Sequence, residues 1–229
     1  MFIESLNLSH FRNFKEVAIS PDRHINLITG SNGSGKTSLL EAIYLLGFGR
    51  SFRPGGFRQL INEHADQFTI FCRTANHSIG VRRNTSGDQT LRLDNANATK
   101  MSEVARLVPV QLLTPESVDI LLEGPSLRRQ FLDWGVFHVE HSFYKNWVSY
   151  TQILKQRNSL LKQYSASATQ DKYWLEQLAY YGELISVSRE NYLKELSDYI
   201  QELAKSFLSN VTIEVRLKKG WDSTQSLFS

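Results

Sequence analysis

Alternation of hydrophobic and polar residues runs through the first half of the chain and predicts β-strands. Neighbouring side chains of a strand point to opposite faces of a sheet, so this period is typical of strands with one buried face. Strands are expected at residues 2–8, 16–20, 24–28, 68–71, 79–81, 91–93 and 108–114. A hairpin turn is expected at 84–89, and a further turn at Pro115.

Hydrophobic residues spaced three and four apart predict helices between and after these strands. Apolar residues from Leu39 to Leu46 share one face of a helix expected at 36–46, directly after a glycine-rich loop. A short helix is expected near 101–107. The order of strand, glycine-rich loop and helix is the one that a phosphate-binding site requires.

Beyond about Ser126 the strand signals stop, and helical periodicity continues to about Ser209. Two series of apolar residues near a heptad spacing, within 143–164 and 178–203, predict an antiparallel helix pair joined near 165–171. The first series contains one charged member, Arg157. Residues 212–217 alternate again and predict a strand that enters a new sheet or rejoins the first one. The chain therefore divides into 1–125, 126–209 and 210–229.

Composition narrows the class of protein. The 229 residues are 41% hydrophobic and 21% charged, which suits a globular protein with a sizeable core. The single cysteine, Cys72, excludes an internal disulfide and a metal site built on cysteine pairs, and it favours a reducing compartment. Residues 1–11 contain neither a basic leader nor a long apolar stretch, so we expect no membrane span and a cytoplasmic location. The net charge of +3 permits contact with a polyanion without demonstrating it.

The glycine-rich loop is a candidate phosphate site. It matches G-x-x-x-x-G-K-[ST] with the residues Gly30, Ser31, Asn32, Gly33, Ser34, Gly35, Lys36 and Thr37. Glycines let successive backbone N–H groups point at one anion, and the following helix adds the positive end of its dipole. We expect Lys36 to neutralise the β- and γ-phosphates and the Thr37 hydroxyl to take one Mg²⁺ coordination position.

Other motifs limit the chemistry at that loop. The sequence has no N-K-x-D string for guanine recognition, which favours ATP over GTP. Hydrolysis also needs an acidic pair that ends a buried apolar strand, and none of 90–94, 110–116 and 130–133 supplies one. His138 and His141 have the wrong order for H-E-x-x-H and lack further ligands nearby, so a metal site is not expected there.

Three further strings resemble one family of ATPases. The string F-R-N-F at 11–14 resembles a motif of ATPases related to the structural-maintenance-of-chromosomes (SMC) proteins. Residues 37–43 with 47–53 look like the segment after the phosphate loop in the RecF family, and 115–116 with 124–133 are close to a RecF fingerprint. Glu123 departs from it, because RecF proteins usually carry a small residue there. The resemblance runs from Met1 to about Trp221.

The resemblance implies an α/β fold, that of a P-loop NTPase with an ABC/SMC-type ATPase head. Residues 1–125 would form the N-terminal part of lobe I, a mixed β-sheet with helices. Residues 126–209 would form the helical lobe II, and 210–229 the start of the return to lobe I. In that group the arginine at the position of Arg12 helps to hold the nucleotide. Two subunits sandwich ATP and Mg²⁺ between the P-loop of one and the signature segment of the other, so ATP closes a homodimer around DNA.

The sequence lacks the signature segment and the acidic Walker B strand of the family. We therefore expect this chain to bind ATP weakly or not at all by itself and not to hydrolyse it. The resemblance implies roles in DNA repair, recombination, replication maintenance and the SOS response, with RecR and RecO as partners and single-stranded or gapped DNA as the substrate.

Contacts with DNA phosphates need basic residues on one surface. The candidates are Arg50, Arg53, Arg58, Arg73, Arg82 and Arg83. Arg128 and Arg129 are expected to be structural or linked to the nucleotide. Two alternatives stay open: a small-molecule or nucleoside kinase with a helical lid, and a remnant whose open sheet edge leads to aggregation.

Overall fold

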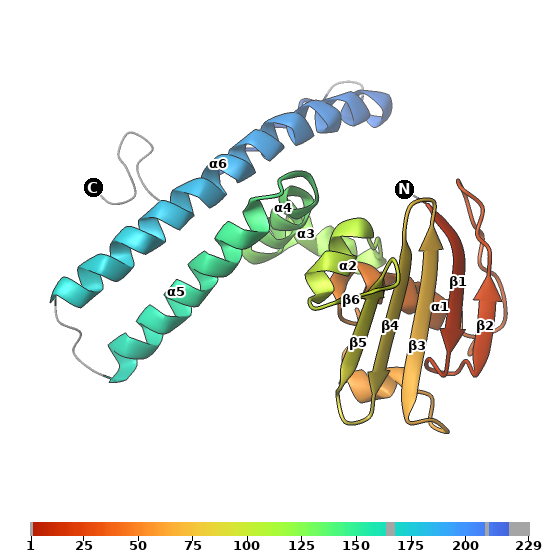
Figure 1. The fold of residues 1–229 in the computed structure, drawn as a ribbon. Coiled ribbons are helices and arrows are strands. Elements are labelled where there is room, and N and C mark those ends of the chain that lie inside the picture. The colour runs from red at the N-terminus through yellow and green to blue at the C-terminus, as the bar shows by residue number, and fades with distance from the viewer. Residues whose placement is uncertain (1, 164–167, 209–210, 220–229) are drawn as a thin grey trace. The chain divides into compact units, whose positions relative to one another are not determined.

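The computed structural model describes residues 2–163, 168–208 and 211–219, with side chains described up to residue 162 and again from 171. The chain forms two compact units, Met1–Thr114 and Pro115–Ser229 (Figure 1). Each unit is described by itself below. The boundary at residue 125 that the sequence suggested stays a prediction.

Within the described part of the first unit, six strands form one antiparallel sheet in the order β2-β1-β3-β4-β5-β6. The strands are β1 (Ile3–Ser9), β2 (Glu16–Ile19), β3 (Gln67–Thr74), β4 (Ser78–Asn84), β5 (Gln89–Leu93) and β6 (Ala96–Ala98). Five of them confirm predicted strands, and the turn between β4 and β5 is where the sequence placed it. The three-residue β6 is too short to show a period and was not predicted.

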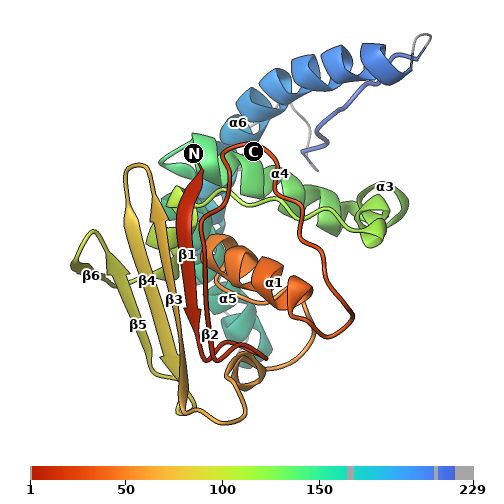
Figure 2. The ribbon, with the colours of Figure 1, turned by 90° about the vertical axis from the view of Figure 1, so that its right-hand side faces the viewer.

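Helix α1 (Lys36–Phe48) and the short helix α2 (Met101–Leu107) confirm both helices predicted in this unit. A single 3₁₀ turn, η1 (Phe57–Leu60), precedes β3. Leu39 and Leu46 of α1 and Val104 of α2 belong to one buried cluster with the inward side chains of the strands, such as Leu6 and Ile70. Helix α1 thus lies on one face of the sheet (Figure 2), and this packing fixes the start of α1 above the glycine-rich loop.

Two predicted strands of the first unit are wrong. Residues 24–28 form no strand, and Ile25 and Leu27 are 88% and 86% exposed. A strand is defined by its neighbour, and the described chain places none beside this segment. Residues 108–114 also form no strand. Val108 instead enters the core, and its carbonyl oxygen passes 2.8 Å from the place where a Cβ on Gly47 would stand.

The described residues of the second unit are helical from Pro115 to Phe207, apart from short connections. The 3₁₀ turn η2 (Pro115–Val118) and helix α3 (Asp119–Leu122) lead into α4 (Pro125–Val139), α5 (Phe143–Gln163) and α6 (Ala168–Phe207). Helices α5 and α6 pack side by side in opposite directions (Figure 1), which confirms the predicted pair. Their joint at 164–167 lies outside the described residues.

Ion pairs connect the helices of the second unit. Arg157, the charged member of the α5 series, donates from Nε and Nη2 to the carboxylate of Asp171 on α6, at 2.8 and 3.2 Å. Arg189 of α6 binds Asp133 of α4 in the same bidentate way. Arg128 donates to the carbonyl oxygen of Glu123 at 2.7 Å and so caps the end of α3, which is a structural contact.

The end of the chain was predicted to contain a strand at 212–217. Residues 212–217 form no strand, because no other described segment pairs with them. The rest of the predicted segment 210–229 falls largely outside the described residues. No helix in the described ranges is both long and apolar enough to cross a bilayer.

Candidate nucleotide-binding site

The glycine-rich loop has the backbone geometry of an anion-binding loop. Gly30, Gly33 and Gly35 have φ angles of +149°, +81° and +101°, a range that side-chain-bearing residues rarely adopt. Gly35 is the residue before α1, so the free N–H groups of the first helical turn open toward the loop. The predicted order of a glycine-rich loop followed directly by a helix is confirmed, and phosphate binding there stays a prediction.

Lys36 lies across the loop and reaches back over it. Its Nζ donates to the carbonyl oxygen of Gly30 at 2.6 Å and to that of Ser31 at 2.8 Å. These bonds hold the ammonium group at the centre of the loop, where it can exchange carbonyl partners for phosphate oxygens. Thr37, the next residue, has an exposed side chain, as a residue that offers its hydroxyl to a Mg²⁺ ion must.

The string at 11–14 forms one wall of the loop. Phe14 packs so closely on Gly35 that a Cβ at that position would lie 2.4 Å from the Cζ atom of the ring. Asn13 donates from Nδ2 to the carbonyl oxygen of Gly33 at 3.4 Å. Phe11 is buried and meets Phe68 edge to face. The string therefore shapes the loop in addition to supplying an arginine.

Two residues in or next to this string have an unfavourable backbone conformation, which hydrogen bonds from one neighbouring segment stabilise. His10 and Arg12 both have a φ of +53°, which costs a residue other than glycine about 1–3 kcal/mol. Residues 60–62 stabilise it: Arg12 N donates to the carbonyl oxygen of Leu60 at 2.8 Å, and Asn62 Nδ2 donates to that of Arg12 at 2.7 Å. A strained turn held this firmly places Arg12 beside the loop.

The guanidinium of Arg12 binds a buried carboxylate on α1. Its Nε and Nη2 donate to Oε2 and Oε1 of Glu41 at 2.9 and 2.6 Å. The Glu41 side chain is fully buried and also accepts a bond from the hydroxyl of Ser51. Arg53 Nη1 lies 3.7 Å from the same carboxylate. The assignment of Arg12 to the nucleotide stays a prediction. The structure adds Glu41 as the partner of Arg12, and Ser51 as a second partner of Glu41.

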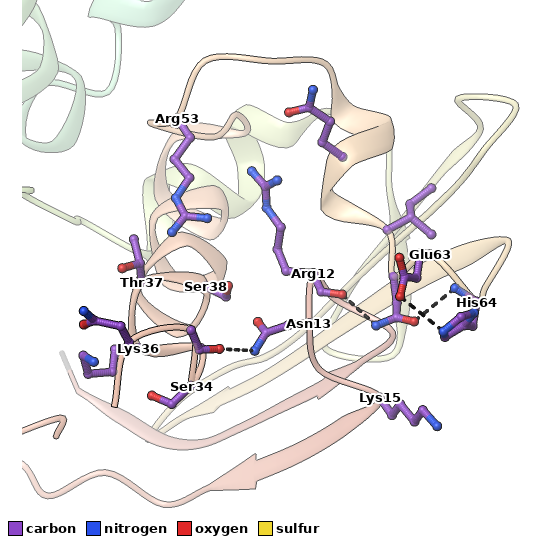
Figure 3. Close-up of a pocket in the computed structure, with 16 residues that line it drawn as sticks. Arg12, Asn13, Lys15, Ser34, Lys36, Thr37, Ser38, Arg53, Glu63 and His64 are labelled. Carbon is purple, nitrogen blue, oxygen red and sulfur yellow. Dashed lines mark hydrogen bonds and ion pairs between the residues drawn. The ribbon is translucent and has the colours of Figure 1, made fainter. Parts of the chain in front are cut away.

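These residues surround a cavity of about 760 Å³ beside the loop (Figure 3). Arg12, Lys15, Lys36 and Arg53 line it as cations, and Glu63 is the acidic residue of its lining. Figure 3 shows Arg12 and Arg53 among the side chains that line the cavity, together with Thr37 and Ser38. A cavity of this size with a cationic wall suits an anionic ligand such as a nucleoside triphosphate.

Sequence reasoning missed the residues that assemble this site. Glu41 lies within residues 37–43, which resemble the RecF family, but it is separated by 29 positions from Arg12, so no local pattern links the two. A signal was present, however, because Glu41 follows Ser38 by three residues and precedes Leu45 by four, on the buried face of the helix. A charged residue on such a face needs a partner.

The structure distributes the six candidate DNA-binding arginines over different places. Arg53 lines the nucleotide cavity, and Arg83 lies over the ring of Phe57 at 3.9 Å. Arg58 donates to the carbonyl oxygen of Thr85, and Arg50 hydrogen-bonds Tyr44. Burial raises the pKa of that tyrosine, and the charge and hydrogen bond of Arg50 oppose the shift.

Arg73 and Arg82 are exposed on the outer face of the sheet, where they are joined by Arg92, which was not a candidate. The alternation of β3, β4 and β5 turns Ile70, Val81 and Leu91 inward, so these three arginines share the opposite face. Gly80 stands opposite Arg92 in the register. Three cations on one sheet face form a patch that scattered sequence positions did not reveal.

Comparison with known proteins gives consistent matches. The family described as the RecF/RecN/SMC N-terminal domain matches residues 2–197. The chain is 76% identical over its whole length to the DNA replication and repair protein RecF of Idiomarina loihiensis. It is 41% identical over 97% of its length to the RecF protein of Shewanella sp. strain MR-4. It spans 64% and 63% of the lengths of these two relatives.

A solved structure of the recombination mediator protein RecF with ATP, from the RecFOR pathway, superposes with a TM-score of 0.79 at 28% identity. The match covers 91% of this chain and 58% of that one. The fold expected from the sequence, an α/β P-loop ATPase head of the ABC/SMC type, is thereby confirmed.

Proposed function

Since the chain belongs to the RecF/RecN/SMC N-terminal domain family and, within it, to the RecF proteins, we propose that it is the ATP-binding part of a DNA repair and replication protein. The observation that carries the proposal is the cationic cavity beside the glycine-rich loop, with Lys36 held across that loop by two carbonyl oxygens. ATP is the nucleotide, and Mg²⁺ joins its phosphates to the hydroxyl of Thr37. When bound, the ion would neutralise phosphate charge.

Titration of the 229-residue chain with Mg·ATP in a calorimeter tests the nucleotide proposal. The sequence left weak binding and no binding open, and the cavity with Lys36 favours binding that is measurable. This binding should be weak, since the sequence contains no signature segment to cover the exposed side of the site. Lys36→Ala removes the ammonium and should abolish that binding. Lys194→Ala is the control, because Lys194 is exposed on α6 and does not line the cavity. Equal ATP affinity in the original chain and in Lys36→Ala would contradict the site, and robust hydrolysis by this chain would contradict the expected lack of an acidic strand.

The outer face of the sheet supports the second element of the proposal, binding of single-stranded or gapped DNA. Arg73, Arg82 and Arg92 can meet successive phosphates without reading sequence. Replacing all three by alanine should weaken the binding of a labelled oligonucleotide, and the slope of log affinity against log salt should fall by about 2. Replacing Lys155, Lys172 and Lys194 of the second unit removes the same charge and serves as the control. Equal losses of oligonucleotide affinity in both triple variants would contradict a DNA-binding role of the outer face of the sheet.

The remaining roles rest on family membership. We infer an ATP-dependent homodimer, partnership with RecR and RecO, and action in recombination and the SOS response, in the cytoplasm. Addition of purified RecR and RecO to the protein in the presence of gapped DNA and Mg·ATP tests the partnership. Failure to recover a joint complex in size-exclusion chromatography would oppose it.

A further inference from the structure

Glu41 occupies an unusual position for a carboxylate. It projects from the buried face of α1 and pairs with two arginines that line the cavity, and its own side chain is fully buried. A buried charge persists only where it is paired and hydrogen-bonded. Glu41 has three such partners, and they come from two segments on either side of α1: Arg12 after β1, and Ser51 and Arg53 after the helix. One carboxylate therefore ties together the three segments that border the phosphate loop.

The two arginines are held unequally. Arg12 makes both charge-assisted bonds of a bidentate pair and is 17% exposed, so its guanidinium is committed to Glu41. Arg53 approaches the same carboxylate with one nitrogen at 3.7 Å and is 37% exposed. Its side chain also lines the cavity (Figure 3). Arg53 is thus the guanidinium that can bind a ligand without losing its anchor.

Ser51 connects Glu41 to the backbone of Arg53. Its hydroxyl donates to Oε1 of Glu41 and accepts a bond from the backbone N–H of Arg53 at 2.8 Å. Rotation of the Arg53 side chain toward a phosphate leaves this backbone anchor intact. The carboxylate therefore fixes the backbone position of Arg53, while the direction of its guanidinium stays free to change.

Charge in the cavity favours an anion even with Glu41 included. Four cationic side chains and the carboxylate of Glu63 line the cavity, and Glu41 lies behind Arg12 and Arg53. Counting these groups leaves two positive charges, which an anionic ligand can neutralise. Glu63 itself is exposed at the rim and pairs with His64 at 3.2 Å.

We propose that Glu41 is a positioning residue of the nucleotide site: it holds Arg12 and, through Ser51, places Arg53 so that its guanidinium reaches a phosphate of bound ATP. The inference rests on the proposed ATP binding. It predicts that a residue with no access to the ligand controls ligand affinity, and that it does so through Arg53.

A double-mutant cycle on the 229-residue chain tests the inference, with Mg·ATP affinity as the readout. Glu41→Gln keeps the shape of the side chain but removes its charge. We expect affinity about tenfold weaker, as when one charge-assisted bond to a ligand is lost. Arg53→Ala should weaken binding by a similar factor. The double variant should bind no more than about twofold more weakly than either single variant, because both changes remove the same contact.

Two further variants keep the test decisive. Glu16→Gln makes the same chemical change at an exposed position of β2 and should leave affinity unchanged. Ser51→Ala breaks the link to Arg53 while leaving the pair of Arg12 and Glu41 in place, so it carries the test if Glu41→Gln does not fold. Hydrogen exchange at the amide of Arg53 should accelerate in Ser51→Ala, while amides of β3 keep their protection.

The outcomes separate the inference from the proposed function. Absence of Mg·ATP binding by the unsubstituted chain overturns the proposed function, and the nucleotide role of Glu41 with it. Binding by the unsubstituted chain, with Glu41→Gln or Ser51→Ala within twofold of it, overturns the role of Glu41 alone. Multiplicative losses in the double variant would also overturn it, since they would show that Glu41 does not act through Arg53.

Discussion

The ring of Phe14 occupies the space that any side chain on Gly35 would need. A Cβ there would lie 2.4 and 2.7 Å from two ring carbons and 2.9 Å from Nδ2 of Asn13. Gly35 is thus required twice, once for its φ of +101° and once for this contact. Gly33 also has a positive φ but has no atom within 4 Å of such a Cβ. Substitutions at these two glycines therefore distinguish the effect of backbone strain from the effect of a steric clash.

We predict that Gly35→Ala destabilises the chain more than Gly33→Ala. Both carry the strain of a left-handed alanine, about 1–2 kcal/mol, and only Gly35→Ala adds a steric clash of about 1–3 kcal/mol. Urea unfolding measures both variants against the original chain. Phe14→Leu should restore part of the stability of Gly35→Ala and none of that of Gly33→Ala. Equal losses in the two alanine variants would show that Phe14 does not restrict the loop.

Features that depend on residues close together in the chain could be predicted from the sequence, and features that depend on distant residues could not. The glycine-rich loop, helix α1 and the turn between β4 and β5 follow from residues close together in the chain, and all were predicted. The strands expected at 24–28 and 108–114 had the right side chains, yet strand pairing depends on a neighbour that local sequence does not specify.

The same distinction applies to the candidate site, of which the contiguous motif was predicted. Lys36 and Thr37 belong to a contiguous motif, but Glu41, Ser51 and Asn62 act through contacts with distant segments. Family resemblance marked the strings around Arg12, Glu41 and Arg53 without relating them. The structure shows that all three strings meet at one carboxylate.

Gly135 of α4 allows a similarly close contact in the second unit. A Cβ at this position would lie 2.3 Å from the hydroxyl oxygen of Tyr192 and 2.4 Å from its Cζ. Alanine is the better helix former by about 1 kcal/mol, so helix propensity alone predicts a stabilising change. We predict instead that Gly135→Ala destabilises the chain by about 1–3 kcal/mol.

The partner residue provides the control for that prediction. In a Tyr192→Leu background the clash is relieved, and Gly135→Ala should become neutral or stabilising. Thermal unfolding of the four proteins of this cycle measures the sign. A Gly135→Ala effect that is the same in both backgrounds would show that the tyrosine ring does not cause it.

Cys72 lies in the core of the sheet, and burial raises the pKa of its thiol to about 11. The folded chain therefore holds the thiol proton more tightly than the unfolded chain, whose thiol has an ordinary pKa near 9. Stability from this group is fully present below about pH 9 and is lost as the pH rises toward 11. We predict that Cys72→Ala shows a shallower decline of unfolding free energy over this range.

Thiol labelling gives a second measure of the same burial. An aromatic disulfide reagent at pH 8 should react with Cys72 only on the timescale of unfolding, because the thiolate is the reactive form. Addition of denaturant should make the reaction fast. Rapid labelling of the native chain at pH 8 would contradict both the burial and the raised pKa.

Asp133 and Arg189 join α4 to α6 by two bonds, of 2.6 and 2.8 Å, with side chains 21% and 20% exposed. Partial burial makes this pair worth more than a surface pair, because either residue alone would keep a poorly solvated charge. We predict a coupling of about 1–2 kcal/mol from a cycle of Asp133→Asn and Arg189→Met in urea unfolding. Glu214 and Arg216 form an exposed pair that supplies the control, for which a cycle of Glu214→Gln and Arg216→Met should give less than about 0.5 kcal/mol. Similar coupling in both pairs would mean that partial burial does not strengthen the pair of Asp133 and Arg189.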